Sequence, residues 1–174
     1  MSELRTIEKG ALLQRQGTKV QWIFKVHSGL IRSFFVDELG KEHVFMFAPE
    51  NWVVADLEAV GFDAPCTLNI EALEPSMIEF IPIVNIAQSM GGMHGGAQEF
   101  NRLIRNTGTL QRRVLLLLSS NALERYEYFL KTYPDLSPRL TQKLIASYLG
   151  VTPQRLSAIR AERVGKSSAR YESM

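Results

Sequence analysis

The stretch LTQKLIASYLGVTPQRLSAIRAERV, residues 140–164, predicts two short helices with a tight turn between them. Apolar residues recur at helical spacing in its first half and give that helix one face for burial. They are Leu144, Ile145, Tyr148 and Leu149. Gly150 predicts the end of this helix because glycine tolerates the left-handed C-cap conformation. Thr152 predicts the cap of the second helix, and Pro153 then falls at its first position, where a missing N–H costs nothing.

The second helix of this stretch carries the residues that indicate a function. Leu156 and Ile159 are expected to face inward, which leaves polar residues such as Arg163 to point outward. A helix, a short turn with glycine and a second helix rich in Arg and Gln form the helix-turn-helix pattern. The second helix of that motif enters the major groove, where Arg and Gln pair with base edges, so we predict DNA binding. The predicted contact residues are Thr152, Gln154, Arg155, Ser157 and Arg160.

Charge is distributed very unevenly along the 174 residues, although the formal net charge is only +2. Residues 1–41 carry 7 Lys or Arg and 4 Asp or Glu, whereas residues 42–101 carry 9 Asp or Glu and neither Lys nor Arg. Residues 102–174 carry 13 Lys or Arg against 5 Asp or Glu. A basic C-terminal third suits a nucleic-acid partner, and the change of sign near residue 100 indicates a domain boundary.

Composition narrows the class of protein. Hydrophobic residues make up 45% of the chain, enough for a sizeable core. No apolar run approaches the roughly 18 residues of a membrane-spanning helix, and the N-terminus lacks the apolar segment of a signal peptide. Cys66 is the single cysteine, so an internal disulfide is excluded. These features predict a cytoplasmic protein without a membrane partner.

Residues 7–81 predict a β-rich domain, a sandwich or small barrel. Short runs of branched and aromatic residues, which favour strands, lie between glycines. The runs are ALLQRQ (11–16), VQWIFKV (20–26), LIRSFFV (30–36), HVFMFA (43–48), CTLNIEAL (66–73) and SMIEFIPI (76–83). Gly40 is expected to take positive φ in the turn after Asp37, and residues 57–60 predict one helical turn ended by Gly61.

Residues 99–121 predict the longest helix. Its apolar residues alternate at spacings of three and four, the a/d seam of a short coiled coil. The seam consists of Phe100, Leu103, Thr107, Leu110, Val114 and Leu117. We predict that this seam forms a homodimer, although a helix packed only on its own domain is the alternative. Neighbouring apolar residues widen this face so that one side can pack internally; they are Ile104, Leu115, Leu116 and Leu118.

Two shorter segments flank this helix. Residues 82–98 include four glycines between Gly91 and Gly96 and predict a flexible linker, with a phosphate-cradling loop as the weaker alternative because no Lys follows. After the long helix, Asn121 and Glu124 have the spacing of a capping box and predict another helix that stops before Pro134. Its aromatic stripe is expected to form the core beneath the DNA-reading helices.

The order of these blocks resembles a known family. EKGALLQRQG, VQWIFKVHSGLIRSFF, DELGKE, FAPENW, ADLEAV and CTLNIEALEPS look like a cyclic-nucleotide-binding β-roll. With the long helix and the helix-turn-helix that follow, they resemble the Crp–Fnr family of bacterial transcription regulators over roughly residues 8–164. The resemblance implies an α+β fold with a β-roll effector domain (1–98) of the jelly-roll or double-stranded β-helix type. A dimerisation helix (99–121) and a helix-turn-helix domain (122–174) follow.

The resemblance also implies a function, that of a cytoplasmic regulator rather than an enzyme. A homodimer would bind a palindromic operator in double-stranded DNA, with half-sites about one helical turn apart. A small-molecule effector in the β-roll and RNA polymerase are the other implied partners. In the family an Arg often stands at the position of Ala158, so a different operator sequence is expected here. The family often adds a β-hairpin wing after the recognition helix, and the tail from Gly165 leaves little room for one.

The effector of this β-roll is not expected to be cyclic AMP. In the resembled family a Glu accepts from the ribose hydroxyl, and an Arg ten residues later pairs with the phosphate beside a Ser or Thr. Asp56, Cys66 and Thr67 match these positions here, and a cysteine cannot neutralise a phosphate. A cyclic-nucleotide regulator in which Arg32 or Lys25 replaces that Arg is the alternative. The predicted effector pocket consists of Trp52, Asp56, Leu57, Cys66, Thr67 and Asn69.

Other functions compete with this interpretation. Cys66 as a redox sensor is a weak alternative, since no neighbouring Lys or Arg in sequence would lower its pKa. A small β-barrel metal enzyme would draw ligands from His27, His43 and His94, with Glu42 and Glu50 nearby. That interpretation leaves the basic helical third unexplained, and we expect no metal or cofactor. A ligand-binding module that lacks DNA binding, or a helical hairpin that is merely exposed, remains open.

Overall fold

The computed structural model describes residues 2–83 and 96–171. The chain divides into two compact units, Met1–Gly108 and Thr109–Met174. The predicted three-part division at residues 98 and 121 stays a prediction. Most of the glycine-rich connector lies outside the described residues.

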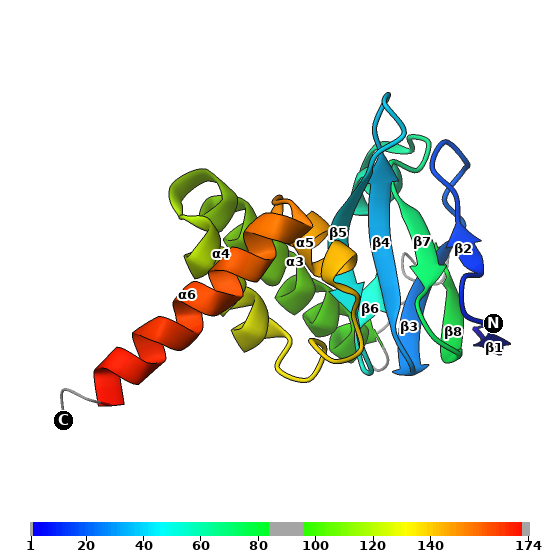
Figure 1. Ribbon diagram of the computed structural model, residues 1–174. Helices are drawn as coiled ribbons and strands as arrows, with labels where there is room; N and C mark the ends of the chain where they lie inside the picture. The colour runs from blue at the N-terminus through cyan, green and yellow to red at the C-terminus, as the bar shows by residue number, and fades with distance from the viewer. Residues whose placement is uncertain (1, 84–95, 172–174) are drawn as a thin grey trace. The chain divides into compact units, whose positions relative to one another are not determined.

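The first unit contains two four-stranded antiparallel sheets, ordered β1-β8-β3-β6 and β2-β7-β4-β5. In Figure 1 the second of these sheets lies in front of the first. The bounds are β1 Glu3–Ile7, β2 Leu12–Gln14, β3 Trp22–Ser28, β4 Ile31–Val36, β5 Glu42–Ala48, β6 Val53–Val54, β7 Asn69–Ala72 and β8 Ser76–Pro82, with helix α1 at Leu57–Phe62. The predicted β-roll is therefore confirmed. The strands β1 and β6 were not predicted, and α1 ends at Asp63 in the left-handed conformation rather than at Gly61.

Side chains alternate along each strand, so each sheet has one apolar face that can be buried. In β8, Ile78 and Phe80 are buried, whereas Met77, the residue before Ile78, is 40% exposed. Side chains of the strand thus alternate between its two faces. Phe24 of β3 lies opposite Phe80 in the antiparallel register, and their rings meet edge-on with centroids 5.2 Å apart. Each such buried aromatic or branched side chain contributes about 1.5–3 kcal/mol of transfer free energy, which is what holds the two sheets together.

A buried arginine joins three strands of the second sheet. Arg32 of β4 is 7% exposed, and its guanidinium pairs with Glu71 of β7 at 2.6 Å and with Glu42 of β5 at 2.7 Å. The same group lies over the Phe34 ring, 3.9 Å from the centroid. A buried charge needs such partners to offset desolvation, so these contacts commit the Arg32 charge to the sheet.

The second unit is helical. Its elements are the end of α3 (Gly96–Ser119), α4 (Ala122–Thr132), α5 (Gln142–Leu149) and α6 (Pro153–Tyr171). The capping box predicted at the start of α4 is confirmed: Asn121 accepts from the N–H of Glu124, and the Glu124 side chain accepts from the N–H of Asn121. Within the described residues, no helix combines the length and apolarity needed to cross a bilayer.

The core of this unit is aromatic, as the stripe on α4 predicts. Phe129 is fully buried, with ring centroids 5.6 Å from Tyr133 and 5.6 Å from Tyr148 of α5. Leu156 and Ile159 of α6 are also fully buried. The three helices therefore share one core, and α6 cannot rotate about its axis without exposing apolar surface.

Gly29 provides a sharp test of this packing. It connects β3 to β4 with φ of +92°, and a Cβ there would lie 2.3 Å from Ser76 Oγ and 2.7 Å from Ser76 Cα. Gly29→Ala should lower the free energy of unfolding by about 2–4 kcal/mol, because the clash adds to the strain of positive φ. Both tryptophans, Trp22 and Trp52, lie in the first unit, so urea unfolding followed by fluorescence measures the change.

Gly40→Ala is the matched control. Gly40 has φ of +76°, but a Cβ there would meet nothing within 4 Å. Its substitution should cost only the backbone term, about 1 kcal/mol. Equal losses at Gly29 and Gly40 would contradict the close approach of Gly29 to Ser76.

Candidate functional site

The turn between α5 and α6 follows the prediction closely. Gly150 ends α5 in the left-handed conformation, with φ of 68° and ψ of 35°, and its N–H donates to the carbonyls of Ala146 and Ser147. Thr152 Oγ1 accepts from the N–H of Arg155 at 3.2 Å and so caps the first turn of α6. Both predictions are confirmed. The turn holds the start of α6 in a defined direction relative to α5.

The first turns of α6 separate buried from exposed residues. Leu156 and Ile159 are fully buried, whereas Gln154, Arg155 and Ser157 are exposed. The buried pair fixes the rotation of the helix; at 100° per residue Gln154 and Ser157 lie opposite it, and Arg155 lies at its side. This is the position from which a recognition helix contacts base edges.

A glutamine that the sequence analysis did not select braces this face. Gln142, the first residue of α5, donates through Nε2 to the carbonyl of Pro153 at 2.9 Å and to the hydroxyl of Ser157. The Ser157 hydroxyl in turn donates to the Pro153 carbonyl at 3.2 Å. Ser157 therefore serves the α5–α6 contact. Its position seven residues after Gly150 gave no sign of this, because the contact joins two helices.

Arg160 is half-buried and contacts α4. Its Nε donates to the Tyr126 hydroxyl at 3.2 Å, and its guanidinium lies 5.8 Å from the centroid of that ring. A tyrosine offers both an acceptor and a π face, and the long apolar stem of Arg can bend toward it. Arg160 thus ties α6 to α4. Its role as a DNA contact stays a prediction.

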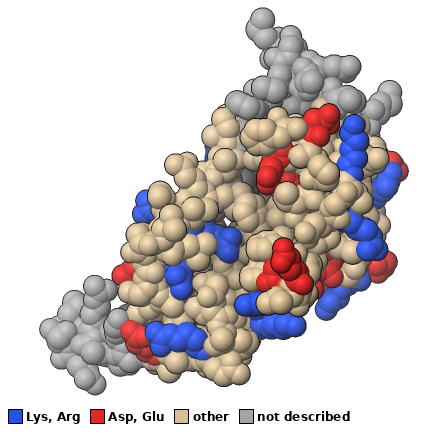
Figure 2. Space-filling model, turned by 90° about the horizontal axis from the view of Figure 1, so that it is seen from above, with Lys and Arg blue, Asp and Glu red and all other residues tan. Residues whose placement is uncertain are grey.

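Exposed basic residues lie on both helices of the motif. Lys143 of α5 and Arg155 and Arg163 of α6 are exposed. On the face of the molecule drawn in Figure 2, Lys and Arg side chains are spread over the surface, with Asp or Glu beside several of them. The candidate interface is therefore defined by particular residues of α5 and α6, not by the net charge of the chain.

One side of α3 packs within the second unit. Arg113 Nη2 donates to the carbonyl of Tyr148 at 2.5 Å, and its guanidinium lies 4.2 Å from the centroid of the Tyr148 ring. The Tyr128 hydroxyl donates to the Thr109 carbonyl at 3.5 Å. Burial lowers the pKa of Arg113 and raises the pKa of Tyr148 to about 12, so the phenol stays protonated at neutral pH. These contacts seat α3 on α4 and α5.

Another side of α3 is apolar and exposed. Ile104 is 53% exposed, Leu115 52% and Leu118 81%, and at 100° per residue these three lie within about 60° of one another. Val114 and Leu117 of the predicted seam are also exposed, at 48% and 37%, although Leu117 borders a small cavity with Tyr148 as well. Leu110 is half-buried. The side chains of Phe100 and Leu103 lie outside the described residues.

Asp56 is the best-connected of the predicted effector residues. It is 1% exposed, and its Oδ2 accepts from the N–H groups of Thr67 at 2.8 Å and Leu68 at 2.9 Å. Its Oδ1 accepts from the N–H of Ala59 at 3.3 Å and caps α1. The carboxylate thereby joins α1 to the segment that leads into β7. The ribose contact that the family resemblance implies would use the same oxygens.

The remaining predicted pocket residues are not gathered around one cavity. Leu57 is 43% exposed, Trp52 is half-buried, and Asn69 Oδ1 accepts from the N–H of Gln16 at 3.0 Å. Cys66 is 2% exposed, and burial raises the pKa of its thiol, which disfavours the reactive thiolate. The predicted effector pocket, including Thr67, stays a prediction.

Arg32 and Lys25, the two possible replacements for the phosphate-binding Arg, both pair with carboxylates of the protein. Arg32 is held by Glu42 and Glu71 as described above. Lys25 lies 3.6 Å from Glu79 on the other sheet. Both charges are therefore matched within the protein.

The histidines form hydrogen bonds with separate carboxylates. His27 Nε2 lies 2.8 Å from Glu79, and His43 Nε2 lies 2.7 Å from Asp37. These bonds lower the pKa of Glu79 and of Asp37. His94 lies outside the described residues. Within the described part of the chain, no three His, Cys, Asp or Glu side chains are grouped to hold a metal ion.

Comparisons with known proteins agree with this architecture. A curated relative, the fumarate and nitrate reduction regulatory protein of Yersinia pestis, is 31% identical over 173 residues, covering 89% of this chain and 66% of the relative. The protein of that name from Escherichia coli is 30% identical with the same coverage. The chain thus spans just under two thirds of the length of these relatives. No family model matches the chain.

Solved structures show the same fold. FixK2 from Bradyrhizobium japonicum superposes with a TM-score of 0.77 and 16% identity, covering 96% of this chain and 86% of that one. A transcriptional regulator of the CRP/FNR family from Thermus thermophilus has a TM-score of 0.74 and 16% identity, covering 94% and 87%. The relatives at 30–31% identity are regulatory proteins by name, and this sets the class as transcription regulators. Within that class, this chain belongs to the Crp–Fnr family.

The described part of α6 covers the region where the family often has a β-hairpin wing. The helix continues from Pro153 to Tyr171, so the described residues after the turn contain no strand.

Asp56→Asn tests the structural role of the buried carboxylate. The amide nitrogen cannot accept, so either the N–H of Ala59 on Oδ1 or those of Thr67 and Leu68 on Oδ2 would lose their partner. We expect the free energy of unfolding to fall by about 2–4 kcal/mol, measured by tryptophan fluorescence in urea. Glu58→Gln, an exposed change one turn away, should alter it by less than about 0.5 kcal/mol. Similar stability of both variants would show that Asp56 does not hold this segment.

Proposed function

We propose that this protein is a cytoplasmic DNA-binding transcription regulator that acts as a homodimer. The observation that carries the proposal is the first turn of α6, where Gln154 and Arg155 are exposed while Leu156 and Ile159 are fully buried. A helix held in this way can present long polar side chains to a major groove without moving its own core. Membership in a family of transcription regulators supports the same function.

The proposed DNA contacts form two groups. Gln154 and Arg155 are placed to meet base edges, and Thr152, Lys143 and Arg163 to meet phosphates at either side. Ser157 acts through Gln142, and Arg160 acts by holding α6 to α4. Two of the five predicted contact residues, Ser157 and Arg160, thus serve mainly to position the helix.

The proposed dimer forms through the exposed apolar arc of α3. Ile104, Leu115 and Leu118 project from one side of the helix, and contiguous apolar surface of this kind marks a contact with another protein. A second copy of the same helix is the natural occupant, since a two-fold pair of helices buries the same residues on both chains. Two recognition helices would then face successive turns of the DNA.

The proposed effector is not cyclic AMP. Cys66 matches the position of the phosphate-binding Arg of the family. The oxygens of Asp56 already accept from backbone N–H groups, and the guanidinium of Arg32 pairs with two carboxylates. A lost charge-assisted hydrogen bond to phosphate costs roughly 1.5–3 kcal/mol, about a 10- to 100-fold loss of affinity. RNA polymerase as a partner rests on the family resemblance alone.

Arg155→Ala tests the DNA interface. The wild-type chain should bind a mixed-sequence duplex at about 50 mM salt, with affinity that falls steeply as salt rises. Removing a base-reading Arg should cost about 1–3 kcal/mol on a selected site, whereas removing a phosphate contact should reduce the salt slope by about one. Fluorescence anisotropy measures both.

Lys131→Ala in α4 is the matched control, because Lys131 is exposed but lies outside α5 and α6. It should leave affinity and salt slope unchanged. Wild-type affinity retained in the Arg155 variant would remove α6 from the interface. Absence of any duplex binding at low salt would instead favour a ligand-binding module without DNA binding.

Leu118→Glu tests the dimer. The side chain is 81% exposed in a single chain, so the change should leave the unit folded, but it would bury a charge in the proposed interface. Sedimentation should show a monomer with greatly weakened operator binding. Leu110→Glu, in the predicted seam, should act in the same direction. Arg112→Glu, on another exposed side of α3, should remain dimeric, and a monomeric wild type at micromolar concentration would contradict the assembly.

A further inference from the structure

One face of α3 lies against α4, α5 and the turn that leads into α6. Thr109, Arg113 and Leu117 recur every four residues, and at 100° per residue they lie within about 80° of one another. The Thr109 carbonyl accepts from a tyrosine hydroxyl of α4, and Arg113 contacts Tyr148 of α5. A Cβ on Gly150 would lie 3.8 Å from Leu117 Cδ2, so Leu117 reaches the turn itself.

Arg113 completes the end of α5. The carbonyls of the last helical turn need partners from outside the helix, because no later helical N–H reaches them. The N–H of Gly150 donates to two of them, those of Ala146 and Ser147. The next carbonyl, that of Tyr148, accepts from Nη2 of Arg113 at 2.5 Å. A side chain of α3 thus holds the end of α5 directly before the turn that directs α6.

The contact between Arg113 and α5 is electrostatic as well as geometric. Burial lowers the pKa of Arg113, but a guanidinium remains protonated in proteins. The carbonyl end of a helix carries a partial negative charge, about half an elementary charge, and attracts a cation placed there. The same guanidinium lies 4.2 Å from the centroid of the Tyr148 ring. The planar group is therefore held by a carbonyl and by a ring of the same residue.

The opposite side of α3 carries apolar residues of the proposed dimer contact. Leu115 and Leu118 are 52% and 81% exposed. At 100° per residue they lie about 200° and 140° around the helix from Arg113. Because one rigid helix carries both faces, a contact with a second copy on one side fixes the position of the α5 end on the other.

We infer that Arg113 is a positioning residue that sets the distance of each recognition helix from the two-fold axis of the dimer, and thereby selects the spacing of the two half-sites. The inference rests on the proposed function, because it needs a dimer that reads DNA. Arg113 acts through the end of α5 and not by touching DNA. One added base pair moves a half-site by about 3.4 Å along the duplex, so firmly held recognition helices reject the altered spacing.

Arg113→Met tests the inference on three duplexes, which carry the selected half-sites at the selected spacing and at one base pair more or less. Methionine keeps an apolar stem but cannot donate to the Tyr148 carbonyl. By fluorescence anisotropy, the wild type should bind the altered spacings at least about tenfold more weakly, and the variant less than about threefold more weakly. A loss of stability alone would weaken binding to all three duplexes by the same factor and leave these ratios unchanged.

Arg112→Met is the matched control, because Arg112 is the exposed neighbour of Arg113 and the same charge is lost. It should discriminate between spacings as the wild type does. Arg113→Lys keeps the charge without the planar fork, so its discrimination should fall between those of the wild type and the methionine variant. Circular dichroism and thermal unfolding check that each variant folds. Equal discrimination by the wild type and both Arg113 variants would overturn the inference and leave DNA binding intact, whereas a wild type that binds none of the duplexes would contradict the proposed function.

A second measurement needs no DNA. A nitroxide attached through Gln154→Cys marks the start of α6 in each copy, and Cys66 is only 2% exposed, so the exposed cysteine is labelled selectively. Pulsed electron paramagnetic resonance then gives the distance between the two labels of a dimer. We expect a narrow distribution in the otherwise wild-type chain and a broader one when Arg113→Met or Arg113→Lys is added. Equal widths would overturn the inference, whereas the absence of any distance between labels would show that no dimer forms and contradict the proposed assembly.

Discussion

The carboxylate of Asp56 is the interaction on which the β-roll depends most directly. It is almost completely buried, and each oxygen accepts from backbone N–H groups that would otherwise have no partner. A buried carboxylate is tolerated only when its oxygens are matched in this way. The segment between α1 and β7 is consequently closed by the chain itself.

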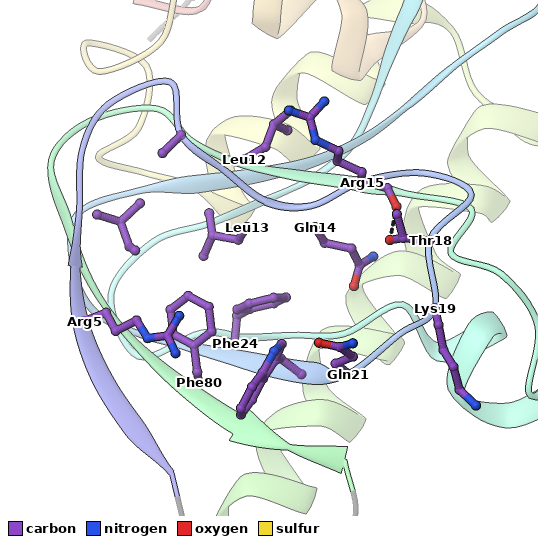
Figure 3. A pocket seen from close by; sticks show the side chains of 13 residues that line it. Arg5, Leu12, Leu13, Gln14, Arg15, Thr18, Lys19, Gln21, Phe24 and Phe80 are labelled. Carbon is purple, nitrogen blue, oxygen red and sulfur yellow. Dashed lines mark hydrogen bonds between the residues drawn. The ribbon is translucent and has the colours of Figure 1, made fainter.

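This closure has consequences for regulation. With Asp56 engaged, Cys66 buried and Arg32 bound to Glu42 and Glu71, the described residues of this region offer no cation for a phosphate. A separate cavity lies among β1, β2 and β3, where Figure 3 shows Arg5 and Gln14 beside the rings of Phe24 and Phe80.

The helical unit depends on its own constraint, the aromatic core shared by α4, α5 and α6. Phe129, Tyr133 and Tyr148 fix how the helices pack, and Leu156 and Ile159 fix the rotation of α6. Gln142 then braces the first turn from α5. Held by α4 and α5, helix α6 presents its exposed polar residues with little freedom.

Local signals predicted much of this structure. The stop at Gly150, the caps at Thr152 and Asn121, and the runs of β-formers each depend on residues close together in sequence, and each was confirmed. Contacts between distant segments were not predictable in this way. Arg160 turns to Tyr126 of another helix, Leu117 turns toward Tyr148, and Gln14 is oriented by Leu68, 54 residues away. Periodicity says which face of an element is apolar, but the neighbour that covers it comes only from the packed structure.

The central claim is that two copies of this chain read DNA through the first turn of α6. Selection of binding sites from a pool of random duplexes tests it most directly. The account predicts enrichment of a pseudo-palindrome whose half-sites are about 34 Å apart, one helical turn, because a two-fold dimer imposes its symmetry on the site. Enriched sequences without dyad symmetry, or no enrichment over the starting pool, would contradict it.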